Sequence, residues 1–164
     1  MNAGDWFARG LQSLHAGAAQ DALDALSTAI QLDPEFAEAY AYRGFAYYRL
    51  DNYDAAMEDY DKAVALWPNL AEAYYFRAIL HGQLKEYQQA IRDYTRAVEL
   101  KPALIEAYYF RALNHGAAGK YEEAIRDMKT AAELGLRDCE EVSGKPQSEA
   151  GEKLTPSPTA AVGV

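Results

Sequence analysis

The chain has 164 residues, of which 50% are hydrophobic and 25% charged, a balance typical of one soluble folded domain. Its formal net charge of -9 disfavours nucleic acid as a partner, because binding phosphates requires clustered Lys and Arg. A single cysteine, Cys139, leaves no intramolecular disulfide. The sequence has no leader-like start and no apolar run of about 20 residues, so it predicts a cytoplasmic protein without a membrane span.

In chain order, the sequence predicts pairs of helices. Helices at 5–15 and 21–32 flank a break at Ala16-Gly17, and helices at 37–50 and 53–66 flank a turn at Asp51-Asn52. Two further pairs have turns at 85–86 and 119–120, and the last helix is expected to end near 134–135. Helices of about 14 residues are marginal alone, so each must pack on its neighbours.

The pairs are copies of one unit. The segment Glu72–Ala78 (EAYYFRA) returns unchanged as Glu106–Ala112, and Pro34, Pro68 and Pro102 share the same spacing of 34 residues. A fixed period of this length is typical of stacked supersecondary units, none of which buries its apolar face alone. The function of such a protein is expected to lie in its surfaces.

The spaced positions of each copy resemble a tetratricopeptide repeat. They are Trp6, Gly10, Ala22, Leu26, Ala29 and Pro34 in the first copy, and Tyr40, Gly44, Tyr47, Ala56, Tyr60, Ala63 and Pro68 in the second. The fourth copy departs from the pattern, with Met128 for the aromatic residue and Leu136 for the proline. The resemblance implies an all-α, right-handed solenoid of four helix-turn-helix hairpins at about 3–36, 37–70, 71–104 and 105–138. Residues 139–164, rich in Pro, Ser and Gly, are predicted to form a flexible tail.

Three arginines stand at equivalent positions, and an aspartate follows each one sixteen residues later. The pairs are Arg43 with Asp59, Arg77 with Asp93, and Arg111 with Asp127. This repetition favours an ion pair between the two helices of each hairpin. The alternative is a ladder of arginines that binds carboxylates, which the neutralising aspartates disfavour.

The sequence gives no basis for an enzyme, a cofactor or a metal site. His81 and His115 occupy equivalent positions of adjacent copies, where the second copy has Tyr47, so they are interpreted as packing residues. Cys139 has no activating pattern beside it. No phosphate-binding glycine loop or nucleophile elbow occurs.

The resemblance also implies that the first helices line a concave groove for partner peptides. The predicted groove residues are Phe7, Leu11, Glu38, Tyr42, Phe45, Tyr48, Arg49, Glu72, Tyr75, Phe76, Ile79, Glu106, Tyr109, Phe110 and Leu113. The family's clamp for chaperone C-terminal carboxylates uses Lys, Asn and Arg, but Phe7, Leu11, Tyr42, Glu72 and Phe76 occupy those places. A mildly acidic, aromatic groove favours an apolar or aromatic protein segment with neutral or basic flanks. The alternative is that several of these rings only pack between adjacent helices, and that the groove holds only the protein's own tail.

Two functions from different classes remain after this reading of the sequence. The first is a non-enzymatic interaction module that binds a peptide or protein segment. The second is a scaffold that assembles into a homo-oligomer through exposed end repeats or the tail, because no solvating helix is evident after the fourth copy.

Overall fold

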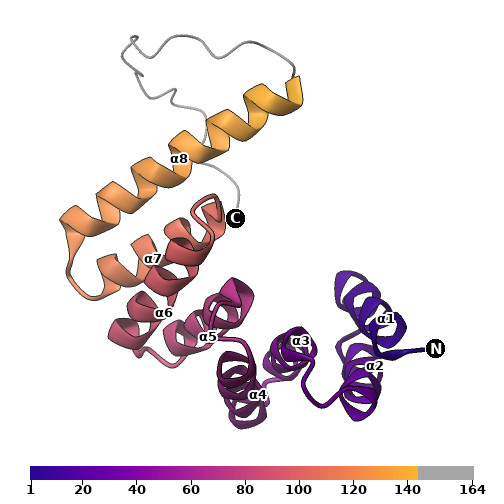
Figure 1. Cartoon of the computed structure of the whole chain (residues 1–164). Helices are drawn as coiled ribbons and strands as arrows, with labels where there is room; N and C mark the ends of the chain where they lie inside the picture. Colours follow the sequence, from indigo (N-terminus) through magenta and orange to yellow (C-terminus); the bar gives the residue numbers. More distant parts are fainter. Residues whose placement is uncertain (144–164) are drawn as a thin grey trace.

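The computed structural model describes the backbone of residues 1–143 and the side chains up to residue 135. This part of the chain contains eight helices and no strand: α1 (Ala3–His15), α2 (Ala19–Leu32), α3 (Ala37–Arg49), α4 (Tyr53–Leu66), α5 (Ala71–Gln83), α6 (Tyr87–Leu100), α7 (Ile105–Ala117) and α8 (Tyr121–Ser143). They pack as four successive antiparallel hairpins (Figure 1). None of the described helices is long and apolar enough to cross a membrane.

A residue with positive φ closes each hairpin. These residues are Gly17, Asp51, Lys85 and Gly119, and they are spaced by the repeat length. Glycine adopts this conformation freely, and aspartate tolerates it. Lys85 adopts it at a cost of about 1–2 kcal/mol, which the packing of α5 on α6 offsets. The turns predicted from the sequence are therefore confirmed.

The hairpins stack into a curved solenoid with the first helices on its inner side. Successive first helices contact one another, α1 with α3, α3 with α5, and α5 with α7. Among the described helices no second helix contacts the next second helix. The first helices are therefore closer together than the second helices, so the surface formed by α1, α3, α5 and α7 is concave.

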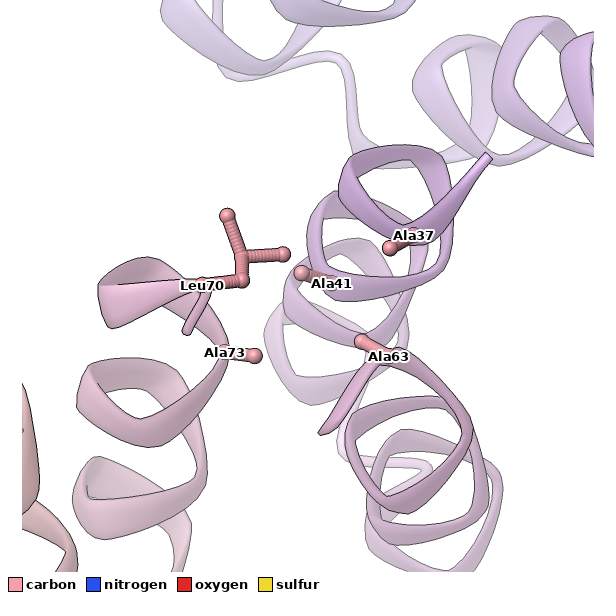
Figure 2. Close-up of a cluster of buried hydrophobic side chains, with 5 residues drawn as sticks. All are labelled: Ala37, Ala41, Ala63, Leu70 and Ala73. Carbon is pink, nitrogen blue, oxygen red and sulfur yellow. The ribbon is translucent and has the colours of Figure 1, made fainter. Parts of the chain in front are cut away.

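Small residues allow adjacent hairpins to approach closely. Between the second and third hairpins, Ala37, Ala41 and Ala63 pack against Leu70 and Ala73, and all five are buried (Figure 2). Large rings fill the space between helices elsewhere in the core. Tyr60 on α4 and Tyr94 on α6, which are equivalent residues of successive hairpins, have at most 1% of their surface exposed. This alternation of small and large side chains gives the solenoid its continuous core.

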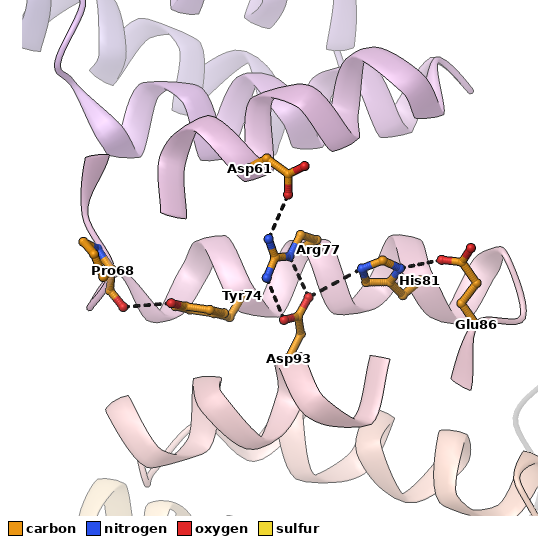
Figure 3. A network of polar contacts seen from close by, with 7 residues as sticks. All are labelled: Asp61, Pro68, Tyr74, Arg77, His81, Glu86 and Asp93. Atoms are coloured by element: carbon orange, nitrogen blue, oxygen red, sulfur yellow. Dashed lines mark hydrogen bonds and ion pairs between the residues drawn. The ribbon is translucent and has the colours of Figure 1, made fainter. Parts of the chain in front are cut away.

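The three predicted arginine–aspartate pairs are confirmed. In the third hairpin, Arg77 Nε donates to Asp93 Oδ2 at 2.7 Å and Nη2 donates to Asp93 Oδ1 at 2.9 Å (Figure 3). The third nitrogen, Nη1, donates to Asp61 on α4 at 2.8 Å. Arg43 and Arg111 repeat this arrangement through Ser27 and Thr95 of the preceding hairpins. Each arginine therefore joins three helices, and its charge is used within the fold.

The last helix differs from the prediction. It was expected to end near 134–135, but α8 continues through Ser143 and extends past the other helices (Figure 1). In the first three hairpins the second helix ends two residues before Pro34, Pro68 or Pro102, because a proline disfavours helical geometry in the residue before it. Leu136 replaces that proline, so the helix continues. The predicted tail lies outside the described residues from 144 onwards.

The two histidines lie beside these ion pairs. His81 Nδ1 is 2.6 Å from Glu86 Oε2, and its Nε2 is 3.7 Å from Asp93 Oδ2 (Figure 3). His115 is buried, with Nε2 3.7 Å from Asp127 Oδ2. Among the described residues no group of three or more His, Cys, Asp or Glu side chains is arranged to hold a metal ion.

His115 is expected to make the fold sensitive to acid. Burial lowers its pKa, Asp127 opposes this shift, and Arg111 adds to it. The unfolded chain takes up the proton near the ordinary histidine pKa of about 6.5, whereas the folded chain takes it up only at lower pH. The unfolded state therefore binds more protons in this window, and the free energy of unfolding falls as the pH drops below about 6.5. Urea unfolding at pH 7.5 and 5.5 should show a smaller loss for His115→Gln than for the wild type, and equal losses would contradict the assignment.

Candidate functional site

Aromatic rings form a continuous row along the concave face. Phe7 on α1 lies 5.6 Å from Tyr42 on α3, measured between ring centroids, and Tyr42 lies 5.2 Å from Phe76 on α5. The row continues from Phe76 through Tyr75, at 5.6 Å, to Phe110 on α7, at 6.4 Å. Each ring therefore packs on a ring of the neighbouring hairpin, and each remains only partly buried.

The predicted groove residues differ in exposure. Most are half-buried, namely Phe7, Leu11, Glu38, Tyr42, Phe45, Tyr48, Glu72, Tyr75, Phe76, Ile79 and Phe110, whereas Arg49, Glu106, Tyr109 and Leu113 are exposed. The half-buried rings also hold the hairpins together. Tyr75, for example, is 6.0 Å from Tyr94 of its own hairpin and 6.4 Å from Phe110 of the next hairpin, so only part of its surface is available to a partner.

A cavity of about 360 Å³ opens between the C-terminal halves of α5 and α7. Its walls include the predicted residues Tyr48, Ile79, Phe110 and Leu113, together with Gly82, Gln83, Tyr87, Tyr94, Asn114 and Ala117. The two tyrosines from α6 were not predicted, because the family register places only first helices in the groove. Their equivalence to Tyr53 and Tyr60 in the preceding hairpin was the available signal. The cavity is large enough for one aromatic or branched apolar side chain.

The acidic residues beside the aromatic row are partly neutralised, which the sequence did not suggest. Lys101, in the turn after α6, donates a hydrogen bond from Nζ to Glu72 Oε1 at 2.7 Å. Burial alone would raise the pKa of Glu72, but this hydrogen bond, a backbone hydrogen bond and the charge of Lys101 together lower it. Glu38 and Glu106 remain beside the aromatic row, and Lys101 was missed because it lies 29 residues from Glu72.

Two tyrosines of the predicted groove, Tyr42 and Tyr75, have raised pKa values and are held in their neutral form. Burial raises the pKa of Tyr75 to about 12, and the neighbouring Glu106 adds to this rise. Burial and then Glu72 raise the pKa of Tyr42. The groove therefore presents aromatic faces and neutral hydroxyl groups beside carboxylates, a combination suited to apolar and cationic side chains.

Family models match the chain along most of the repeats. A tetratricopeptide repeat model matches residues 37–70 and 71–104, a second, described as TPR repeat, matches 16–51, and a third tetratricopeptide repeat model matches 105–134. The chain belongs to the tetratricopeptide repeat family. None of the curated proteins matches it significantly.

Solved structures of tetratricopeptide repeat proteins share the fold. A crystal structure of MamA is 29% identical, with a TM-score of 0.74, covering 85% of this chain and 81% of MamA. MamA 41-end from Desulfovibrio magneticus RS-1 is 26% identical, with a TM-score of 0.69 and coverages of 80% and 75%. The first TPR of Spaghetti (RPAP3), bound to the HSP90 peptide SRMEEVD, is 27% identical, with a TM-score of 0.67 and coverages of 72% and 94%.

Proposed function

We propose that this protein is an interaction module whose concave face binds a protein segment with an apolar or aromatic anchor and basic flanks. The observation that carries the proposal is the row of half-buried rings leading to the cavity of about 360 Å³ between α5 and α7. Half-buried aromatic residues offer large contact area at low entropic cost, and such anchors commonly dominate the energy of binding.

The charged residues beside the aromatic row support basic flanks in the partner segment. Glu38 lies near the hydroxyl of Tyr42 and Glu106 near that of Tyr75. Lys101 is already paired with Glu72, and Arg49 lies over the Phe45 ring, 5.9 Å from its centroid. A basic side chain therefore meets carboxylates beside aromatic faces, whereas an acidic terminus meets repulsion.

The peptide bound to RPAP3 can serve as a comparison ligand for this protein. That protein is bound to the acidic HSP90 peptide SRMEEVD. The positions of the family's carboxylate clamp are here Phe7, Leu11, Tyr42, Glu72 and Phe76, and none of these side chains carries a positive charge. We therefore expect SRMEEVD to bind this protein poorly, if at all.

The test is selection from a random peptide library, followed by titration of the selected peptides. We expect enrichment of Phe, Tyr, Trp or Leu with neighbouring Lys or Arg, and at least a tenfold lower affinity for SRMEEVD. Tyr42→Ala and Tyr75→Ala, each first shown to be folded by circular dichroism, should weaken binding about tenfold, equivalent to about 1.4 kcal/mol.

Tyr121→Ala is the matched control. This tyrosine is 69% exposed on α8 and does not line the groove, so its loss should leave peptide affinity unchanged. Selection of acidic C-terminal peptides, or binding that neither groove substitution affects, would overturn the proposal.

A further inference from the structure

The C-terminal end of the solenoid exposes an apolar surface that the interior hairpins bury. Ile125 on α8 is 69% exposed, whereas its equivalent Ile91 is 9% exposed. Met128 is 36% exposed, whereas its equivalent Tyr94 is 1% exposed. Tyr121 on α8, with Tyr109 and Leu113 on α7, completes this surface, and all three are exposed. We call these five residues the terminal face.

In the interior hairpins, the surface equivalent to the terminal face packs against the following helix. The third-hairpin equivalents of Tyr109 and Met128 are Tyr75 and Tyr94, whose ring centroids lie 6.0 Å apart. Both rings contact Phe110 of the following first helix, each at 6.4 Å. The terminal face presents the same two positions without a following helix among the described residues. A contiguous apolar surface of this kind marks an interaction site.

The opposite end of the solenoid does not complement this face. In the later hairpins, the positions that contact the preceding hairpin include Leu70, Ala73 and Leu80. The equivalent residues of the first hairpin are Asn2, Asp5 and Gln12, all polar and exposed. Asn2 and Asp5 cap α1 through reciprocal hydrogen bonds at 2.8 and 3.0 Å. Head-to-tail stacking would bury these polar groups against apolar ones, so a symmetric contact between two terminal faces is favoured.

The apolar residues of α8 recur with the spacing of a helix pair. Tyr121, Ile125, Met128 and Ala132 are separated by four, three and four residues, and all four are exposed. A stripe that alternates steps of three and four is the pattern by which two helices pack along their length.

The charges beside this stripe select an antiparallel register. With a two-fold axis between positions 126 and 127, Ile125 faces Met128 of the second copy, and Tyr121 faces Ala132, so large and small side chains alternate. Glu122 of each copy then lies beside Lys129 of the other copy. Both residues are exposed. Sliding by seven residues would place the two Lys129 side chains together, which like-charge repulsion disfavours.

We propose that the terminal face binds a second copy of this chain, through antiparallel pairing of α8 with α8. The contact is symmetric, so it closes a dimer and does not extend into a filament. The terminal face shares Tyr109 and Leu113 with the predicted groove. The substitutions that test the two proposals do not overlap, because Ile125 is not a predicted groove residue and Tyr42 and Tyr75 are not part of the terminal face. Failure of one proposal can therefore be told from failure of the other.

The first test is the mass of the full chain in solution, measured by light scattering across a concentration series. We expect the mass to rise to twice that of one chain, and Ile125→Glu to return it to one chain with an unchanged circular dichroism spectrum. A wild-type protein that stays monomeric, or a dimer that Ile125→Glu leaves intact, overturns the proposal.

Charge exchange tests the register. Glu122→Lys alone places Lys beside Lys129, and Lys129→Glu alone places Glu beside Glu122, so each variant should dimerise about tenfold more weakly. A mixture of the two variants restores both opposite-charge pairs and should form a heterodimer. Glu123→Lys, which makes the same charge change at an exposed position away from the stripe, should dimerise as the wild type does. A mixture that fails to recover, or equal weakening by Glu123→Lys, contradicts this register.

Discussion

Asp93→Ala is expected to lower the free energy of unfolding by about 3 kcal/mol, because it leaves a shielded guanidinium without its main partner. The side chains of Arg77 and Asp93 are only 20% and 11% exposed, and the carboxylate accepts two hydrogen bonds from the arginine. The remaining contact of Arg77 with Asp61 keeps the loss at the lower end of the range for broken buried pairs. Chemical denaturation of the wild type and variant measures the difference.

Asp61→Ala is the matched control for this prediction. It removes a carboxylate from the same arginine, but Asp61 is 61% exposed, and exposed pairs contribute only about 0.2–1 kcal/mol. The double variant with Arg77→Ala and Asp93→Ala should lose less than the sum of the two single losses, because both remove the same interaction. Strictly additive losses would show that the two residues do not stabilise each other.

Tyr60→Ala is expected to cost about 3–5 kcal/mol, the range for removing a large ring from a core. Tyr60 is fully buried between α3, α4 and α5, against Ala56, Leu80 and Phe76. Gly44 lies so close that a Cβ there would sit 2.6 Å from the ring. The surrounding helices are fixed by both neighbouring hairpins and cannot collapse into the space, so thermal and urea unfolding should both show the loss.

Tyr60→Phe separates the ring from its hydroxyl group. None of the described residues forms a hydrogen bond with this buried oxygen, and burying an unpaired hydroxyl is unfavourable. The variant should therefore be as stable as the wild type, or more stable by up to about 1 kcal/mol. A loss as large as that of Tyr60→Ala would contradict this account of the core.

The parts of the fold that depend on contacts within one hairpin could be predicted from the sequence. The turns at Gly17, Asp51, Lys85 and Gly119 follow from the period and from local backbone preferences. The arginine–aspartate pairs follow from a separation of sixteen residues that recurs three times. Each arginine's further bond to the preceding hairpin was not predicted, because that contact depends on the angle between neighbouring hairpins.

The candidate groove was predictable only in outline. The family register identified the first-helix positions, and these include the rings of Tyr42, Tyr75 and Phe76 that now form the aromatic row. The register left open whether these rings only pack between adjacent helices, and in the structure they pack on one another and remain partly exposed. It also missed the pairing of Lys101 with Glu72 within the third hairpin. That pair does not recur, because the equivalent residues of the second hairpin are Trp67 and Glu38.

By itself the sequence determined a solenoid of four helical hairpins, because a period of 34 residues repeats the same local signals: small residues where helices approach, a turn residue, and a proline after the second helix. Which surfaces stay exposed depends on how the hairpins pack in the tertiary structure. The curvature brings Tyr87 and Tyr94 from α6 into the wall of the cavity. The uninterrupted α8 and the missing fifth hairpin among the described residues leave Ile125 and Met128 exposed. Exposure depends on what packs beside a residue, and equivalent positions in successive repeats therefore differ in exposure although their local sequences are alike.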